Sequence, residues 1–162
     1  MHGHKIIDNF LPRGNLIKLQ SIINSSDFDW YYIKDLNNQS SKDDLGVYFV
    51  HVVYHQGRAS NFMHIFSPIL TRLDIKSLIR IKINLYTRTS TLEVHPSHVD
   101  EDYPHTGAIF YLNTNDGKTI LEDGTKVDSV ANRVLLFDAS TKHSSTSTTD
   151  SKVRLNININ YQ

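Results

Sequence analysis

The sequence predicts a mostly β domain, a sandwich or barrel, with helices packed on one side. Apolar residues recur at helical spacing in the first third of the chain, whereas from residue 77 onward they alternate with polar residues. Turn signals separate the short β-prone segments. The 162 residues suit a single domain. We expect residues 1–75 to form a helical support region and residues 76–162 to form the β core.

Two helices are expected in the support region. Residues 15–24 and about 61–73 each place apolar side chains on one helical face. We expect both apolar stripes to pack in the core. Two polar stretches are predicted to lack regular helix. Residues 37–44 are expected to form a loop that is a candidate lid over a site, and the Ser/Thr-rich residues 140–151 are expected to form a loop or hairpin.

Four strands are expected, at residues 77–88, 106–113, 132–138 and 152–161. The first and last alternate strictly, with Ile or Leu on one face and Arg, Lys, Asn or Tyr on the other. If helices cover the apolar faces, the polar faces look into the barrel. The alternative is that the apolar faces fill the barrel and the polar faces meet solvent; we favour the inward orientation. The inward polar residues of these two strands would be Arg80, Lys82, Asn84, Tyr86, Arg154, Asn156 and Asn158.

Composition limits the function classes. Lys plus Arg equals Asp plus Glu, at 17 each, so no nucleic-acid partner is expected. No apolar run has the length of a membrane span, and the N-terminal residues lack the apolar segment of a signal peptide. The absence of cysteine excludes disulfides and thiolate chemistry, and fits a cytoplasmic location. The sequence does not indicate an oligomeric state.

A metal site is indicated by three residues. His98 and Asp100 are two positions apart, so in an extended chain they point to the same side. His143, in the loop after the third expected strand, could supply a further ligand. Two histidines and one carboxylate form the facial triad of non-haem Fe(II) oxygenases, which leaves positions open for a cosubstrate and oxygen. The alternative is that these are polar loop residues without a metal.

Arg154 strengthens the metal interpretation. It follows His143 by eleven positions, on the last alternating strand. A 2-oxoglutarate molecule that chelates iron leaves a second carboxylate several ångströms away. The planar guanidinium of arginine is the best two-toothed donor for such a group. Asn84 and Asn156, with Lys82 or Arg80, are expected to contact 2-oxoglutarate or the substrate.

His98-Val99-Asp100, Tyr111-Leu112-Asn113, His143 and Arg154 together resemble the prolyl 4-hydroxylase-like branch of the 2-oxoglutarate/Fe(II)-dependent dioxygenases. The resemblance covers residues 79–161, and is greatest to the small stand-alone oxygenases of bacteria and tailed phages; for a phage protein, the location would be the host cytoplasm. It implies a double-stranded β-helix (jelly roll) with N-terminal helices on the larger sheet. It also implies C–H hydroxylation coupled to decarboxylation of 2-oxoglutarate to succinate and CO2, with O2 consumed and ascorbate as a reductant.

The resemblance also implies residue roles. His98, Asp100 and His143 would bind iron, Arg154 and Tyr111 would bind the far carboxylate of 2-oxoglutarate, and Tyr86 would be another tyrosine of that pocket. Where the family often has Gly-Gly after Tyr-Leu-Asn, this chain has Asp116-Gly117-Lys118. The collagen-type enzymes use Lys in place of Arg154. Both departures weaken the transfer of proline as the substrate, so a peptidyl proline, another amino-acid residue and a small metabolite all remain open.

Further residues and rival classes of protein bear on this interpretation. His95 and His105 flank the first two ligands and are expected to shape substrate entry, not to bind iron. Trp30, Tyr31 and Tyr32 are expected to pack in the core or between helix and sheet, and not to stack on substrate. One rival class is a jelly-roll module that binds metal without turnover; another is a cupin-like metalloenzyme, disfavoured because no His-x-His pair is suitably placed. Asp100 disfavours a halogenase, which needs a small residue at that position.

Overall fold

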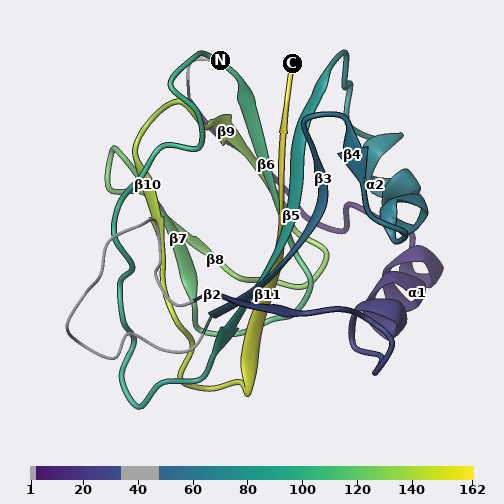
Figure 1. The fold of residues 1–162 in the computed structure, drawn as a ribbon. Helices are drawn as coiled ribbons and strands as arrows, with labels where there is room; N and C mark the ends of the chain where they lie inside the picture. The colour runs from purple at the N-terminus through teal and green to yellow at the C-terminus, as the bar shows by residue number, and fades with distance from the viewer. Residues whose placement is uncertain (1–2, 34–47) are drawn as a thin grey trace.

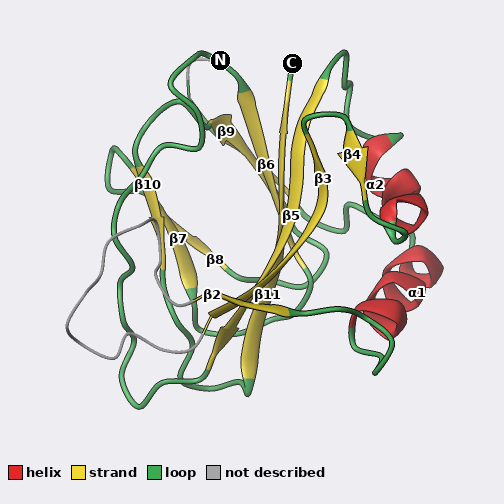
Figure 2. Cartoon of the chain, in the orientation of Figure 1, coloured by secondary structure: helices red, strands yellow, loops and turns green. Residues whose placement is uncertain are grey.

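The computed structural model describes residues 3–33 and 48–162, and these form two facing antiparallel sheets with helices on one side (Figures 1 and 2). The large sheet has the order β1 (Lys5–Ile7), β9 (Val134–Asp138), β6 (Thr106–Tyr111), β11 (Val153–Tyr161), β5 (Leu78–Thr87), β3 (Tyr48–His55) and β2 (Tyr31–Ile33), with β4 (Arg58–Ala59) beside β3. The small sheet has the order β10 (His143–Ser145), β7 (Lys118–Leu121) and β8 (Lys126–Asp128). The predicted mostly β fold with flanking helices is therefore confirmed.

The inward orientation of the polar faces is confirmed at the centre of the large sheet, where β5 and β11 pair. Ile81, Ile83, Ile157 and Ile159 are fully buried in one cluster, which also contains apolar residues of both helical segments. On the opposite face of β11, Arg154, Asn156 and Asn158 are buried as well. Burial on both faces places the hydrophobic core beneath the helices and a polar interior between the sheets.

Helix α1 (Arg13–Ile23) lies where the first helix was expected and buries Leu19 and Ile23. The second expected helix is shorter and divided into a 3-10 turn, η2 (Met63–Phe66), and α2 (Ser67–Leu70). Pro68, at the start of α2, lacks an N–H, so a continuous helical hydrogen-bond pattern cannot pass through it. Helices α1 and α2 lie outside the large sheet, and α2 lies near β3 and β4 (Figure 2).

Several strands carry no clear alternating signal and were not expected. In addition to its helices, the region up to residue 75 supplies β1 to β4. The stretch 140–151, expected as a loop or hairpin, contains the short strand β10. Trp30 is partly buried against Phe28, with ring centroids 5.2 Å apart, in agreement with a packing role. Tyr31 and Tyr32 are exposed on β2, so the packing prediction was wrong for these two residues. The loop 37–44 lies outside the described residues.

None of the described helices has the length and hydropathy needed to span a membrane.

Candidate metal centre and adjoining cavity

Backbone pairing brings the three predicted metal ligands together. His98 and His143 form an isolated antiparallel bridge, with two N–H···O hydrogen bonds of 2.9 Å between their backbones. The backbone N–H of Asp100 donates to the carbonyl oxygen of Ala139, at 3.1 Å. The loop that precedes β6 is thereby fixed against the start of β10. His98 and Asp100 share a side of the chain as expected, although this segment is a bridged loop and not a strand.

The donor atoms of His98, Asp100 and His143 lie within 4.8 Å of one another and could hold one metal ion. Oδ1 of Asp100 is 3.9 Å from Nε2 of His98, and Oδ2 is 3.8 Å from Nε2 of His143. Nε2 of His143 is buried and has no hydrogen-bond partner in the described part of the chain. A buried nitrogen aimed at a carboxylate and a second imidazole fits a metal ligand.

Backbone carbonyls select the same tautomer in both imidazoles, the one in which Nε2 can bind a metal. Nδ1 of His143 lies 3.1 Å from the carbonyl oxygen of Thr141, and Nδ1 of His98 lies 3.4 Å from that of Pro96. A carbonyl oxygen only accepts hydrogen bonds, so Nδ1 carries the proton and Nε2 presents its lone pair. Burial, together with the neighbouring His143, lowers the pKa of His98 to about 4. His98 is therefore neutral at physiological pH.

Asp100 is held as a carboxylate by two neighbours. Nη2 of Arg80 lies 2.6 Å from Oδ1, and Nδ2 of Asn158 donates to Oδ2 at 3.0 Å. Burial by itself would raise the pKa of Asp100, but the charge of Arg80, followed by His143 and the hydrogen bond from Asn158, outweighs it and lowers the pKa to about 2. Two imidazole rings that present Nε2 and one anionic oxygen ligand are thus preorganised.

Arg154 is fully buried, and no Asp or Glu of the described residues forms an ion pair with it. Its guanidinium donates to hydroxyl oxygens on three other segments: Ser129 at 2.8 Å, Ser145 at 2.6 Å and Thr119 at 3.2 Å. A side chain at Gly117 would collide with Cδ of Arg154, so glycine permits this close approach. Burial lowers the pKa of Arg154, although the adjacent tyrosines oppose the shift.

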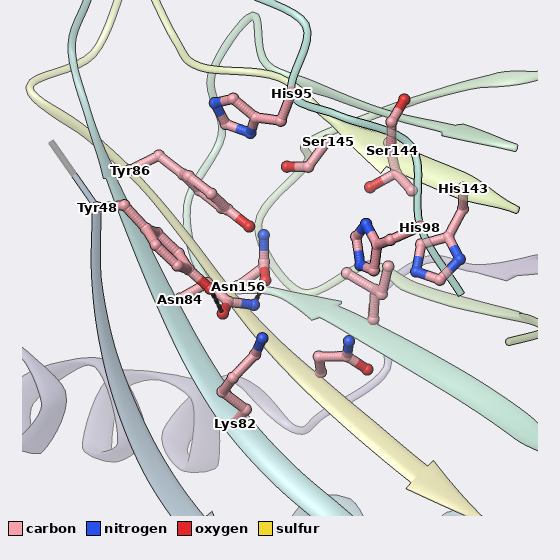
Figure 3. Close-up of a pocket in the computed structure, with 13 residues that line it drawn as sticks. Tyr48, Lys82, Asn84, Tyr86, His95, His98, His143, Ser144, Ser145 and Asn156 are labelled. Atoms are coloured by element: carbon pink, nitrogen blue, oxygen red, sulfur yellow. Dashed lines mark hydrogen bonds between the residues drawn. The ribbon is translucent and has the colours of Figure 1, made fainter. Parts of the chain in front are cut away.

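A cavity adjoins the triad, and Figure 3 shows His98 and His143 at one side of it and Ser145 nearby. His98 and His143 form part of its lining, and Thr119 and Ser145, which both bind the guanidinium, form another part. Arg154 does not line the cavity itself, because its guanidinium lies behind these two hydroxyls. Tyr111 also lies behind the wall, and its hydroxyl donates to Oγ1 of Thr119 at 2.8 Å.

The remaining wall is a chain of polar and aromatic contacts. The hydroxyl of Tyr48 donates to Oδ1 of Asn84 at 2.6 Å, and Nδ2 of Asn84 donates to Oδ1 of Asn156 at 2.8 Å. The ring of Tyr86 stacks between those of Tyr48 and His95, with centroids 4.9 Å from each (Figure 3). Asn84, Asn156 and Tyr86, all named from the sequence, therefore share one wall.

Sequence reasoning did not identify Tyr48, Thr119, Ser129 or Ser145. Tyr48 is placed opposite Tyr86 only by the pairing of β3 with β5, and no local sequence pattern predicts that register. The three hydroxyls come from separate segments and converge only around the guanidinium.

Other expected residues divide between the cavity and its surroundings. His95 and Lys82 line the cavity, whereas Arg80 lies beside it, bonded to Asp100. His105 is buried outside the lining, with Nδ1 2.8 Å from the carbonyl oxygen of Tyr103.

The sequence matches no protein-family model and no curated protein. Solved structures match over nearly the whole chain. A prolyl hydroxylase from Trichoplax adhaerens, in complex with a peptide fragment of the hypoxia inducible factor oxygen degradation domain, has 15% identity and a TM-score of 0.67, covering 99% of this chain and 84% of that one.

A prolyl-4-hydroxylase from Pseudomonas putida has 15% identity and a TM-score of 0.64, covering 100% and 93% of the two chains. HygX from Streptomyces hygroscopicus, with nickel and 2-oxoglutarate bound, has 15% identity and a TM-score of 0.63, covering 98% and 82%. The chain therefore has the jelly-roll fold of the 2-oxoglutarate/Fe(II) oxygenases.

Proposed function

We propose that the protein is an Fe(II)- and 2-oxoglutarate-dependent dioxygenase that hydroxylates a C–H bond of a peptide or small molecule. One observation carries the proposal. A preorganised His-Asp-His ligand set lies at one side of the cavity, and a buried arginine without an acidic partner among the described residues lies behind another part of its wall. Iron would bind to the three ligands, and the far carboxylate of an iron-bound 2-oxoglutarate would pair with the arginine.

The ligand set fits Fe(II). His98, Asp100 and His143 supply two imidazole nitrogens and one carboxylate oxygen, which is the donor set of the non-haem Fe(II) oxygenases. No thiolate competes, because the chain has no cysteine. Three protein ligands would leave further coordination positions for the keto acid and for oxygen.

The environment of Arg154 fits the far carboxylate of 2-oxoglutarate. Burying a guanidinium without a counter-charge costs several kcal/mol even when neutral groups accept its hydrogen bonds. A carboxylate that enters between Thr119 and Ser145 would meet the guanidinium and both hydroxyls. Tyr111 would act from behind, through its hydrogen bond to Thr119.

When bound, iron and 2-oxoglutarate supply the oxidising chemistry, in which O2 drives decarboxylation to succinate and CO2 together with hydroxylation of the substrate. The protein contributes geometry. Arg80 and Asn158 fix the plane of the Asp100 carboxylate, and the backbone carbonyls at Pro96 and Thr141 fix the two imidazole rings. The wall that contains Tyr48, Asn84 and Asn156 would orient the cosubstrate and keep water from it.

The identity of the substrate stays open between a peptidyl proline, another amino-acid residue and a small metabolite. Ascorbate would serve as a reductant that keeps the iron in its Fe(II) state. A cytoplasmic location, a single domain over residues 1–162 and the absence of a nucleic-acid partner stay predictions from the sequence.

The test is formation of succinate from 2-oxoglutarate by purified protein with Fe(II), ascorbate and O2, combined with anaerobic calorimetry of 2-oxoglutarate binding. Arg154→Gln should raise the Kd of 2-oxoglutarate roughly 100-fold, because it removes charge-assisted hydrogen bonds. Asp100→Ala should abolish succinate formation. Arg58→Gln and Asp27→Ala, at exposed positions, are the matched controls, and circular dichroism establishes that each variant folds.

If the wild-type protein binds metal but neither binds nor consumes 2-oxoglutarate, the proposal fails and the non-catalytic jelly-roll module takes its place.

A further inference from the structure

A cationic side chain that the proposed function does not use lines the cavity. Lys82, on β5, lines the cavity beside the triad. Its amine points toward the hydrogen-bonded pair Asn84 and Asn156 (Figure 3). Burial, followed by the charge of Arg80, lowers the pKa of Lys82 to about 8, while Asp100 opposes the shift. The ammonium form therefore predominates at neutral pH.

Lys82 has no acidic partner within the described residues. Asp100, the carboxylate that acts on it electrostatically, is already bonded to Arg80 and Asn158. The amide oxygen of Asn158, in register with Lys82 on the neighbouring strand, is buried without a hydrogen-bond partner, so it does not accept from the ammonium either. Among the residues that the structure describes, no Asp or Glu lines the cavity.

The cofactors of the proposed function would not supply the missing negative charge. Iron(II) and the 2-oxoglutarate dianion cancel each other. Among the described residues, the three cationic side chains around the cavity, Arg80, Lys82 and Arg154, are then balanced by one carboxylate, that of Asp100. Excess positive charge in a partly enclosed site is unfavourable until an anion enters, and it attracts anions as they approach.

We propose that Lys82 is a specificity-determining residue that binds an oxyanion of the substrate, either a carboxylate or a phosphate. The inference rests on the proposed function and specifies its substrate class. The substrate would present its anionic group to Lys82 while the C–H bond to be oxidised lies toward the triad. A neutral prolyl peptide without an acidic group near the target residue would be disfavoured.

The test uses protein loaded with Zn(II), which does not undergo redox chemistry, and saturated with 2-oxoglutarate. Acetate, methyl phosphate and acetamide are titrated separately at constant ionic strength. The side-chain NMR signal of Lys82, in protein labelled with 13C-lysine, is the readout and is assigned with Lys82→Arg. We expect acetate or methyl phosphate to shift this signal saturably, whereas acetamide does not; the anion that binds more tightly identifies the source of the oxyanion.

Variants make the result specific. With calorimetry as the readout, Lys82→Met should weaken anion binding roughly tenfold or more, because it removes a charged hydrogen-bond donor. Lys82→Arg should restore binding. Lys126→Met, at an exposed lysine of β8, is the matched control.

Three outcomes would overturn the inference: no saturable binding of either anion, equal binding of acetamide, or undiminished anion binding to Lys82→Met. Calorimetry with 2-oxoglutarate tests whether Lys82 binds the cosubstrate and not the substrate. If Lys82→Met weakens 2-oxoglutarate binding by the same factor, Lys82 serves the cosubstrate and the inference is wrong. If the wild-type protein binds neither Zn(II) nor 2-oxoglutarate, it is the proposed function that fails.

Discussion

The side-chain amide of Asn158 donates a 3.0 Å hydrogen bond to Oδ2 of Asp100, the oxygen that lies 3.8 Å from Nε2 of His143. Arg80 holds the other oxygen, Oδ1, at 2.6 Å. The carboxylate is thus fixed on both sides by residues outside the proposed ligand set. Such supporting contacts set the orientation of a ligand, and with it the affinity of a metal site.

Asn158→Ala should therefore weaken metal binding without removing a ligand. We expect the Kd of Mn(II), measured by calorimetry, to rise about 10- to 100-fold, the usual effect of losing a supporting contact. Asn61→Ala, at an exposed asparagine, is the control. An unchanged Kd in Asn158→Ala would mean that the hydrogen bond does not hold the carboxylate in its binding orientation.

Metal binding should stabilise the fold, and His98 should be required for it. At a free Zn(II) concentration of 100 times its Kd, linkage predicts about 2.7 kcal/mol of added stability and a melting temperature higher by several degrees. His98→Ala should lose this shift. His64→Ala, at an exposed histidine of η2, should retain it. A full shift in the His98 variant would exclude this residue as a ligand.

Tyr48→Phe tests the wall of the cavity. The substitution removes the hydroxyl that donates to Asn84 but keeps a ring that can stack on Tyr86. We expect the free energy of unfolding to fall by about 1 kcal/mol, since the donor of a buried hydrogen bond is lost. Denaturant unfolding with an unchanged m-value would measure the loss. Tyr31→Phe, at an exposed edge-strand tyrosine, should have no measurable effect.

His95 should make the metal-free protein sensitive to acid. Burial, with Arg154 and then His98 nearby, lowers the pKa of His95 to about 4 from 6.5. Between these two values the unfolded chain binds the proton and the folded protein does not, so stability falls as pH falls from 6.5 toward 4.

The measurement compares unfolding free energies at pH 7 and pH 5 in the presence of a chelator. A single group with this shift contributes about 2 kcal/mol to the difference. His95→Phe should therefore lose about 2 kcal/mol less than the wild-type protein over this range. Equal losses in the two proteins would show that another group governs the acid sensitivity.

The strands at the centre of the fold could be predicted because their residues alternate strictly. That period placed Ile81 and Ile157 on the core face and Arg154 and Asn156 in the interior, as the structure has them. Strand β3 was missed because the sequence around Val52 and Tyr54 does not alternate regularly, and the structure has a bulge there.

The candidate metal site was easier to predict than its surroundings. His98 and Asp100 are two positions apart, and Arg154 follows His143 by eleven positions, so these residues form a recognisable spacing pattern. Thr119, Ser129 and Ser145 have no spacing that signals a common role. Their convergence depends on pairing between distant strands, which no local pattern encodes.

The opposite faces of β11 divide two tasks between alternate residues. The odd-numbered positions from Leu155 to Ile159 pack in the hydrophobic core, and the even-numbered positions from Arg154 to Asn158 face the polar interior. Exchanges at even positions therefore act on the polar interior, whereas exchanges at odd positions act on the packing of the core. One nine-residue strand thus gives evolution two nearly independent sets of sites, one that sets the chemistry of the interior and one that sets the stability of the fold.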